Sequence, residues 1–293
     1  MAIINKPSEH FETKLYTGNG STQSITGLDF APDFFWTKGR ASGGYHNILC
    51  NLIQGTGVCL SSNLTNAELA RGVTSFNTDG VSLDSNADLN GNGINFASWN
   101  WKAGGTAVSN TDGTITSSVS SNPTAGFSVV SYTGGGSAGA TIGHGLGVKP
   151  DMILLKRRDG IASNWAVYHQ SLGATKYLIL NGTNASTTSN TRWNDVEPTP
   201  PVFTLGSSGD VSGSGENFIA YCFAEKKGYS KFGSYIGNGS ADGTFVYTGF
   251  KPAFIMAKCS SAVGDWVITD VKRNTYNPLS KRLFPNQSIA EDT

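Results

Sequence analysis

The chain has 293 residues, and its 21 basic and 21 acidic side chains give a formal net charge of zero. Only 14% of the residues are charged, below the roughly 25% of an average globular protein, which argues against a nucleic-acid-binding protein. Glycine, serine, threonine and asparagine together supply 122 residues, and this composition disfavours long amphipathic helices. Apolar residues still reach 38%, so the chain can form sizeable cores, and its length predicts about two or three domains.

The beginning of the chain and its cysteines indicate where the protein is made. Residues 1–7 lack the pattern of a signal peptide, and no apolar run approaches the roughly 18 residues of a membrane helix, so no membrane insertion is expected. The cysteines show no C-x-x-C spacing, which fits synthesis in a reducing cytoplasm. We expect all four to be small core residues: Cys50, Cys59, Cys222 and Cys259.

A repeat organises the rest of the sequence. Three segments begin with a tyrosine, two residues before a glycine, and continue through Ser/Thr/Gly-rich stretches to an apolar run headed by proline. The distance from tyrosine to proline is 16, 18 and 17 residues. The segments begin at Tyr16, Tyr132 and Tyr235, and the apolar runs begin at Pro32, Pro150 and Pro252.

The first two repeats also end alike. Residues 95–101 and 217–223 both begin with Asn-Phe, and aromatic residues alternate along them with a period of two, the signature of a strand with one face on a core. The third repeat has only 59 residues, from Tyr235 to Thr293, and lacks such a closing strand. We therefore expect its free edge to be covered by a neighbouring chain or by further sequence.

These patterns predict an all-β protein of tandem antiparallel β-sandwich repeats, jelly-roll or concanavalin-like, with the third repeat incomplete. The only helical turn predicted is 66–71. The predicted organisation is an N-terminal docking segment (1–15), repeat 1 (16–102), a Gly/Ser/Thr-rich linker (103–126), repeat 2 (127–225) and repeat 3 (226–293). Because repeats 2 and 3 are joined tightly, we expect them to pack as one rod.

Metal and nucleotide motifs are weak. Gly134, Gly136 and Gly139 match a dinucleotide fingerprint, but a hairpin-like run follows in place of a helix, so no cofactor is expected. Alternating oxygen ligands at Asp84, Asn86 and Asp88 make a weak calcium candidate, since the glycine and glutamate of a calcium loop are missing; an exposed hairpin loop is the alternative. No zinc spacing occurs among the histidines, which are His10, His46, His144 and His169.

The segment 191–198 holds the candidate binding residues. Trp193 has no counterpart at the equivalent place in the first repeat, and beside Arg192 and Asp195 it could stack on a sugar ring. Trp165 and Trp266 follow their prolines by 15 and 14 residues and are expected in the core.

The same segment contains Asp195 and Glu197, a carboxylate pair of the kind that glycoside cleavage needs; the alternative is a solvated loop. No nucleophile-elbow motif is present, and we expect no enzymatic activity.

At the repeat openings, Tyr16–Ser21 leading to Pro32–Lys38, the sequence resembles a family of virion proteins from tailed bacteriophages, especially of marine bacteria. The likeness covers almost the whole chain. It implies concanavalin- or SPRY-like β-sandwich units on tail fibres or other appendages of the particle, and it transfers no catalytic residue.

The resemblance implies location in the virion, after assembly in the host cytoplasm. Three functions stay open: a tail-fibre or receptor-binding protein that attaches to a host-surface glycan or protein, a capsid-decorating fibre or tail adaptor that binds other virion proteins, and a glycan-degrading tailspike. A homotrimer is expected from the family likeness alone.

Overall fold

The computed structural model describes residues 4–41 and 43–293. Those residues form a nearly all-β protein, in which several antiparallel sheets of short strands are accompanied by single-turn helices. The predicted fold class is thereby confirmed. No described helix is long and apolar enough to cross a membrane.

The first unit (residues 11–101) has two layers. Its six-stranded sheet has the order β1 (Phe11–Thr17), β9 (Asn95–Trp101), β3 (Phe34–Gly39), β4 (Asn47–Asn51), β5 (Val58–Ser61) and β6 (Leu69–Ala70). A smaller sheet of β2 (Gln23–Ile25), β8 (Gly80–Leu83) and β7 (Val73–Asn77) covers one face. The helix α1 (Ala87–Asn90) precedes β9. The closing strand β9 therefore lies between the opening strand β1 and the proline-headed strand β3.

The second unit (residues 108–223) repeats this order. Its sheet contains β12 (Phe127–Thr133), β19 (Asn217–Phe223), β14 (Met152–Arg157), β15 (Ala166–His169), β16 (Lys176–Ile179) and β17 (Thr187–Thr188). A small sheet of β13 (Thr141–Gly143) and β18 (Val202–Thr204) forms the second layer, and α2 (Gly209–Ser212) precedes β19. The strands predicted from alternation at 95–101 and 217–223 have the bounds that the sequence suggested.

Two predicted segment boundaries need correction. The expected linker 103–126 contains β10 (Val108–Asn110) and β11 (Ser117–Asn122), which extend the second sheet because the outer edge of β12 would otherwise leave its backbone groups unpaired. The expected docking segment 1–15 includes a short 3-10 helix, η1 (Pro7–Glu9), and the first five residues of β1; Met1 to Ile3 lie outside the described residues.

The predicted helical turn at 66–71 is wrong. Residues 69–70 form β6, which pairs with β5, and the backbone N–H of Glu68 donates to the carbonyl of Arg158 in the second unit. Contacts between units therefore hold this segment extended against its helical propensity.

The third unit (residues 226–293) has one layer only. It contains β20 (Phe254–Lys258) and β21 (Trp266–Asp270), and Leu283 bridges to Ile268 as β5 pairs with β4. Among the described residues, nothing after this point corresponds to β7, β8, α1 or β9. Its opening segment therefore has no strand beside it, and residues 233–247 are exposed coil.

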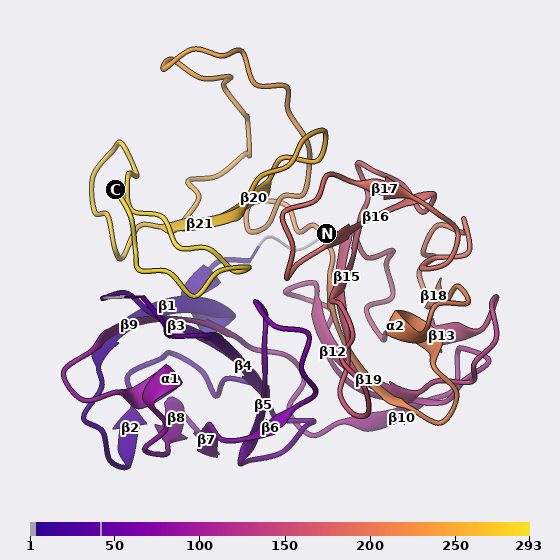
Figure 1. The fold of residues 1–293 in the computed structure, drawn as a ribbon, viewed down its shortest axis with the longest axis horizontal. Coiled ribbons are helices and arrows are strands. Elements are labelled where there is room, and N and C mark those ends of the chain that lie inside the picture. Colours follow the sequence, from indigo (N-terminus) through magenta and orange to yellow (C-terminus); the bar gives the residue numbers. More distant parts are fainter. Residues whose placement is uncertain (1–3, 42) are drawn as a thin grey trace.

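The three units close into a ring around one shared core (Figure 1). This corrects the expected rod, because the third unit contacts the first as well as the second: Asn47 Nδ2 donates to the carbonyl of Phe284, and Trp266 Nε1 to that of Ile179. Trp165 Nε1 of the second unit donates to the carbonyl of Ser61 in the first, so each unit contacts the other two. The core combines Phe34, Trp36, Leu49 and Leu60 with Leu154, Trp165, Val167 and Tyr221 and with Trp266, Ile268 and Leu283.

Candidate functional site

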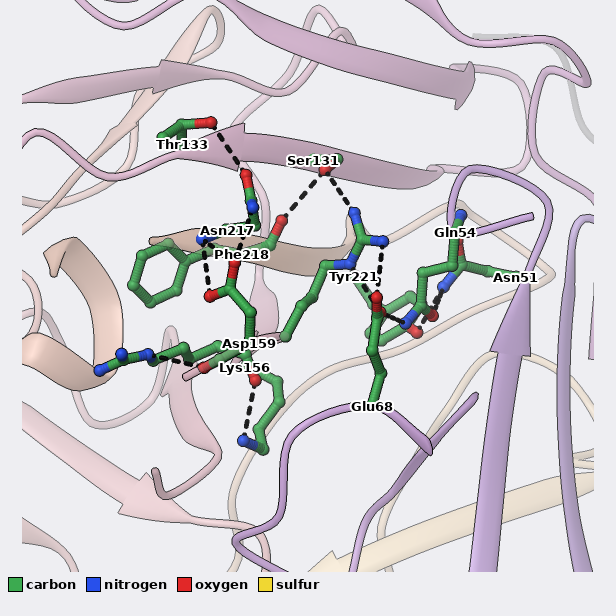
Figure 2. Close-up of polar contacts among 12 residues, drawn as sticks. Asn51, Gln54, Glu68, Ser131, Thr133, Lys156, Asp159, Asn217, Phe218 and Tyr221 are labelled. Atoms are coloured by element: carbon green, nitrogen blue, oxygen red, sulfur yellow. Dashed lines mark hydrogen bonds and ion pairs between the residues drawn. The ribbon is translucent and has the colours of Figure 1, made fainter. Parts of the chain in front are cut away.

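The junction between the first two units contains a continuous polar network (Figure 2). The carboxylate of Glu68 accepts hydrogen bonds from both ends of the Arg158 guanidinium, Nε at 2.9 Å and Nη2 at 3.2 Å. Glu68 also accepts from Gln54 Nε2 at 2.9 Å, and Asn51 Nδ2 contacts both Gln54 Oε1 and the hydroxyl of Tyr221. These side chains are largely buried, and their mutual pairing offsets the cost of removing them from water.

The junction between the third and first units has the same construction. Arg40 donates to Glu291 through Nε at 3.0 Å and Nη2 at 2.9 Å, and the N–H of Glu291 bonds the carbonyl of Arg40 at 2.9 Å. Arg273 joins Glu291 to Asp270, which accepts from the indole N–H of Trp99. Two of the three junctions therefore rest on a bidentate ion pair.

The junction between the second and third units keeps the backbone contact without the charges. The N–H of Ser186 donates to the carbonyl of Ser260 at 2.8 Å, where the other junctions have Glu and Arg. The three contacts together relate the units by an approximate threefold arrangement within one chain.

One lysine in each unit donates a hydrogen bond to a backbone carbonyl of the preceding unit in the ring. Lys38 Nζ donates to the carbonyl of Ser288, Lys156 Nζ to that of Thr65, and Lys258 Nζ to that of Thr183. Burial lowers the pKa of Lys38 and of Lys156 to about 8, because desolvation disfavours the charged ammonium. The lysines follow their prolines at one repeat position, so their role is structural and shared.

The predicted sugar-binding residues do not form an exposed site. Trp193 is only 1% exposed and packs edge-on against Tyr168 in the second unit's core, so its ring cannot stack on a ligand. Arg192 pairs with Asp210 of α2 at 2.5 Å and lies over the ring of Tyr177. Asp195 is exposed in a turn with φ of 55°. The prediction that Trp193 belongs to a loop segment is confirmed, but the prediction that its side chain is available to a ligand is wrong.

The carboxylate pair is divided between two environments. Glu197 accepts hydrogen bonds from the Tyr168 hydroxyl at 2.5 Å and from the N–H of Ala174 at 2.6 Å, while Asp195 points to no described hydrogen-bond donor. Glu197 therefore anchors the segment to the sheet, whereas Asp195 lies in the exposed turn.

The oxygens of the calcium candidate are already engaged by protein donors. Asp84 accepts from the N–H groups of Gly72 and Asn86, Asn86 caps α1 by accepting from the N–H of Asp88, and Asp88 pairs with Arg71 at 2.6 Å. Within the described residues, no cluster of three or more His, Cys, Asp or Glu side chains is arranged to hold a metal ion. The alternating pattern thus encodes a turn and a helix cap.

The cysteines are correctly predicted only in part. Cys222 is buried, whereas Cys259 is exposed. Cys50 and Cys59 are joined by a disulfide, which single-sequence spacing did not indicate; the neighbouring strands β4 and β5 bring their Cα atoms to 4.6 Å. Trp165 and Trp266 are buried, as predicted.

The third-unit loop, residues 232–250, exposes several large apolar side chains within a short stretch. The exposed fraction is 88% for Ile236, 86% for Phe245 and 77% for Tyr247. Beside it, a hollow of about 260 Å³ lies between residues 225–231 and 247–249. Lys227, Lys231 and Glu225 contribute charge to this hollow, so the surface combines aromatic and charged groups. The repeat signalled this region, because only the third repeat lacks a closing strand.

Comparison with known protein families places the chain in a family. Residues 6–293 match DUF7483, a domain of unknown function, and the chain belongs to that family. Searches of curated proteins and of solved structures found no match.

Proposed function

We propose that the chain is a structural protein of a tailed-bacteriophage particle, built into a tail fibre or a related appendage that attaches to the host surface. The observation that carries this proposal is the ring itself. One tyrosine-to-proline motif, the motif that resembles phage virion proteins, is used three times to build one body whose units interlock around a shared core. Such a body suits the rigid display of loops.

The surface chemistry is consistent with attachment by many weak contacts. The exposed hairpin ends between β14 and β15 and between β20 and β21 each present one aliphatic residue, Ile161 at 74% and Val263 at 75% exposure. Repetition of modest contacts over many copies in a particle raises avidity by several orders of magnitude. A host-surface glycan or protein is the proposed partner.

A second function is supported by the approximate threefold arrangement inside one chain. A single copy could occupy a threefold position on a particle, as a capsid-decorating or tail-adaptor protein would, and bind other virion proteins there. This role requires no host receptor.

Antibody labelling of intact particles tests both functions. We expect antibodies against the chain to decorate the particle, and label at the distal tail together with binding of the fluorescently labelled protein to host cells supports attachment. Label on the shell or at a tail junction, without cell binding, supports decoration or adaptor function. Particles that carry no label would contradict both.

A further inference from the structure

The strand β20 has one free edge. It pairs with β21 on one side only. The N–H of Val271 donates to the carbonyl of Ala253, so Ala253 and every second residue after it direct their backbone groups towards β21. The backbone groups of Phe254, Met256 and Lys258 therefore point away from β21. Within the described residues, no strand pairs with that edge.

The two complete units show what lies at this edge. In the first unit β9 pairs with β3, so that Trp99 is opposite Trp36. In the second unit β19 pairs with β14, so that Tyr221 is opposite Leu154. Met256 occupies the same repeat position, four residues after the proline, and an incoming strand in this register would place an aromatic residue opposite it.

The strand β20 is less covered than its counterparts: Phe254–Lys258 are all half-buried or exposed, whereas every residue of β3 and β14 is buried. The 260 Å³ hollow opens between residues 225–231, which lead into the opening segment, and residues 247–249, which lead into β20. Phe232 already packs on the shared core at this place, where it contacts Phe223 and His169.

Neighbouring units also bind the closing strands. The indole of Trp99 donates to Asp270 of the third unit, and the hydroxyl of Tyr221 bonds Asn51 of the first. His169 is the residue at the corresponding position of the second unit, four residues after Trp165, as Asp270 is four after Trp266. It is half-buried and faces the third unit, where it lies 6.5 Å from the ring of Phe232.

The third unit lacks the contact that holds the chain after its own closing strand. Asp33 accepts from the N–H of Ala103 at 2.6 Å, and Asp151 accepts from that of Glu225 at 2.5 Å, in each case two residues after the closing strand. Ala253 stands at the same position and has no acceptor side chain. This difference favours a strand that arrives from another molecule over one followed by more of the same unit.

We propose that the third unit binds an extended segment of another polypeptide, with aromatic residues at alternate positions, as an antiparallel strand on the free edge of β20 between that strand and the opening segment. Main-chain hydrogen bonds would supply affinity, and the shared core and His169 would select the aromatic side chains. The inference does not depend on the proposed phage function.

The experiment uses the full chain and a synthetic peptide with the sequence of Asn217–Phe223, in which serine replaces the cysteine. Hydrogen exchange of the protein is measured with and without the peptide. We expect exchange within residues 254–258 to slow by at least about tenfold, with no change in β3 or β14, whose edges are already paired.

Two controls separate edge pairing from adhesion to an apolar surface. A peptide whose tyrosine amide is N-methylated lacks a donor that faces β20, and it is expected not to protect the protein. Met256→Pro removes an outward N–H of β20 without removing a hydrogen bond to β21, and Met256→Leu is the matched variant that keeps the N–H.

The peptide should protect Met256→Leu and not Met256→Pro. The proposal is overturned if the unmodified peptide fails to protect residues 254–258, or if the N-methylated peptide protects them equally. The N-methylated peptide gives this answer on the unaltered protein, even if Met256→Pro does not fold.

Discussion

In the first two units an arginine pairs with an aspartate of the short helix, and the space beside this ion pair is filled differently in each unit. In the first, Arg71 pairs with Asp88 of α1, and the next residue is Gly72, where a Cβ atom would clash with the sulfur of Cys59. In the second, Arg192 pairs with Asp210 of α2, and the next residue is Trp193. The same position in the fold is therefore filled by a disulfide next to a glycine in the first unit and by a buried indole in the second.

The difference teaches that a repeat can keep its backbone while the chemistry of its core changes. The position of Cys50 in β4 corresponds to that of Tyr168 in β15, three residues after Asn47 and Trp165. In one unit a covalent bond restricts the unfolded chain; in the other, aromatic surface is removed from water. Replacing each filling separately measures what it contributes.

The largest expected effect is that of Trp193→Ala. Because Trp193 is 1% exposed, its truncation leaves a cavity in the second unit and lowers the free energy of unfolding by about 3–5 kcal/mol. Urea denaturation measures the loss, and Trp193→Phe should lose less. An unchanged free energy of unfolding would show that the ring is not part of a packed core.

Removal of the disulfide ranks second. The double substitution Cys50→Ala with Cys59→Ala opens a loop in which the cysteines are nine residues apart, and it should cost about 2–3 kcal/mol. The exposed Cys259→Ser is the control and should be neutral. The comparison between the units fails if the double variant unfolds at the same urea concentration as the unaltered protein.

The junctions provide the next test. Glu68→Gln and Glu291→Gln each weaken a bidentate pair and should destabilise the ring by about 1–2 kcal/mol, because a largely buried guanidinium loses its charged acceptor. Ser186→Ala, at the uncharged junction, keeps its backbone contact and should change stability by under about 0.5 kcal/mol. Equal losses at all three positions would contradict the distinction between charged and uncharged junctions.

The pH dependence comes from Lys38 and Lys156. Their pKa values fall from 10.5 to about 8 on folding, so between these values the unfolded chain binds more protons, and stability rises as the pH rises through this window. Relative to Lys156→Met, the unaltered protein should gain about 2 kcal/mol between pH 7.5 and 9.5. A stability difference that does not vary with pH would place the ammonium in water.

Calcium should have the smallest effect. Since protein donors already engage Asp84, Asn86 and Asp88, we expect no shift of the melting temperature when Ca²⁺ is titrated into the protein. A rise that saturates with Ca²⁺, and is absent in Asp84→Asn, would restore the calcium site.

The sequence predicted the features that depend on local pattern. Alternation placed β9 and β19, the prolines placed β3, β14 and β20, and the short third repeat indicated an incomplete unit. The role of Trp193 escaped because a tryptophan within a polar segment is ordinarily assigned to a loop, whereas the space it fills is defined by residues far away in the sequence.

Contacts between units were not predictable from single segments. Glu68 and Arg158 are 90 residues apart, and Arg40 and Glu291 are 251 apart. Comparison of the repeats could have found the pattern. Arg40 and Arg158 each follow the repeat lysine by two residues, and Glu68 and Glu291 make the same backbone contact with them. The disulfide required knowledge of which strands are neighbours.

The ring of three units belongs to a single chain, and this has a consequence for assembly. A trimer of separate subunits dissociates on dilution, because its association depends on the concentration of free subunits. Here each unit is tethered to the other two, so the junctions form in an intramolecular step at a high effective concentration. The ring of three units should therefore remain closed at any dilution of the protein.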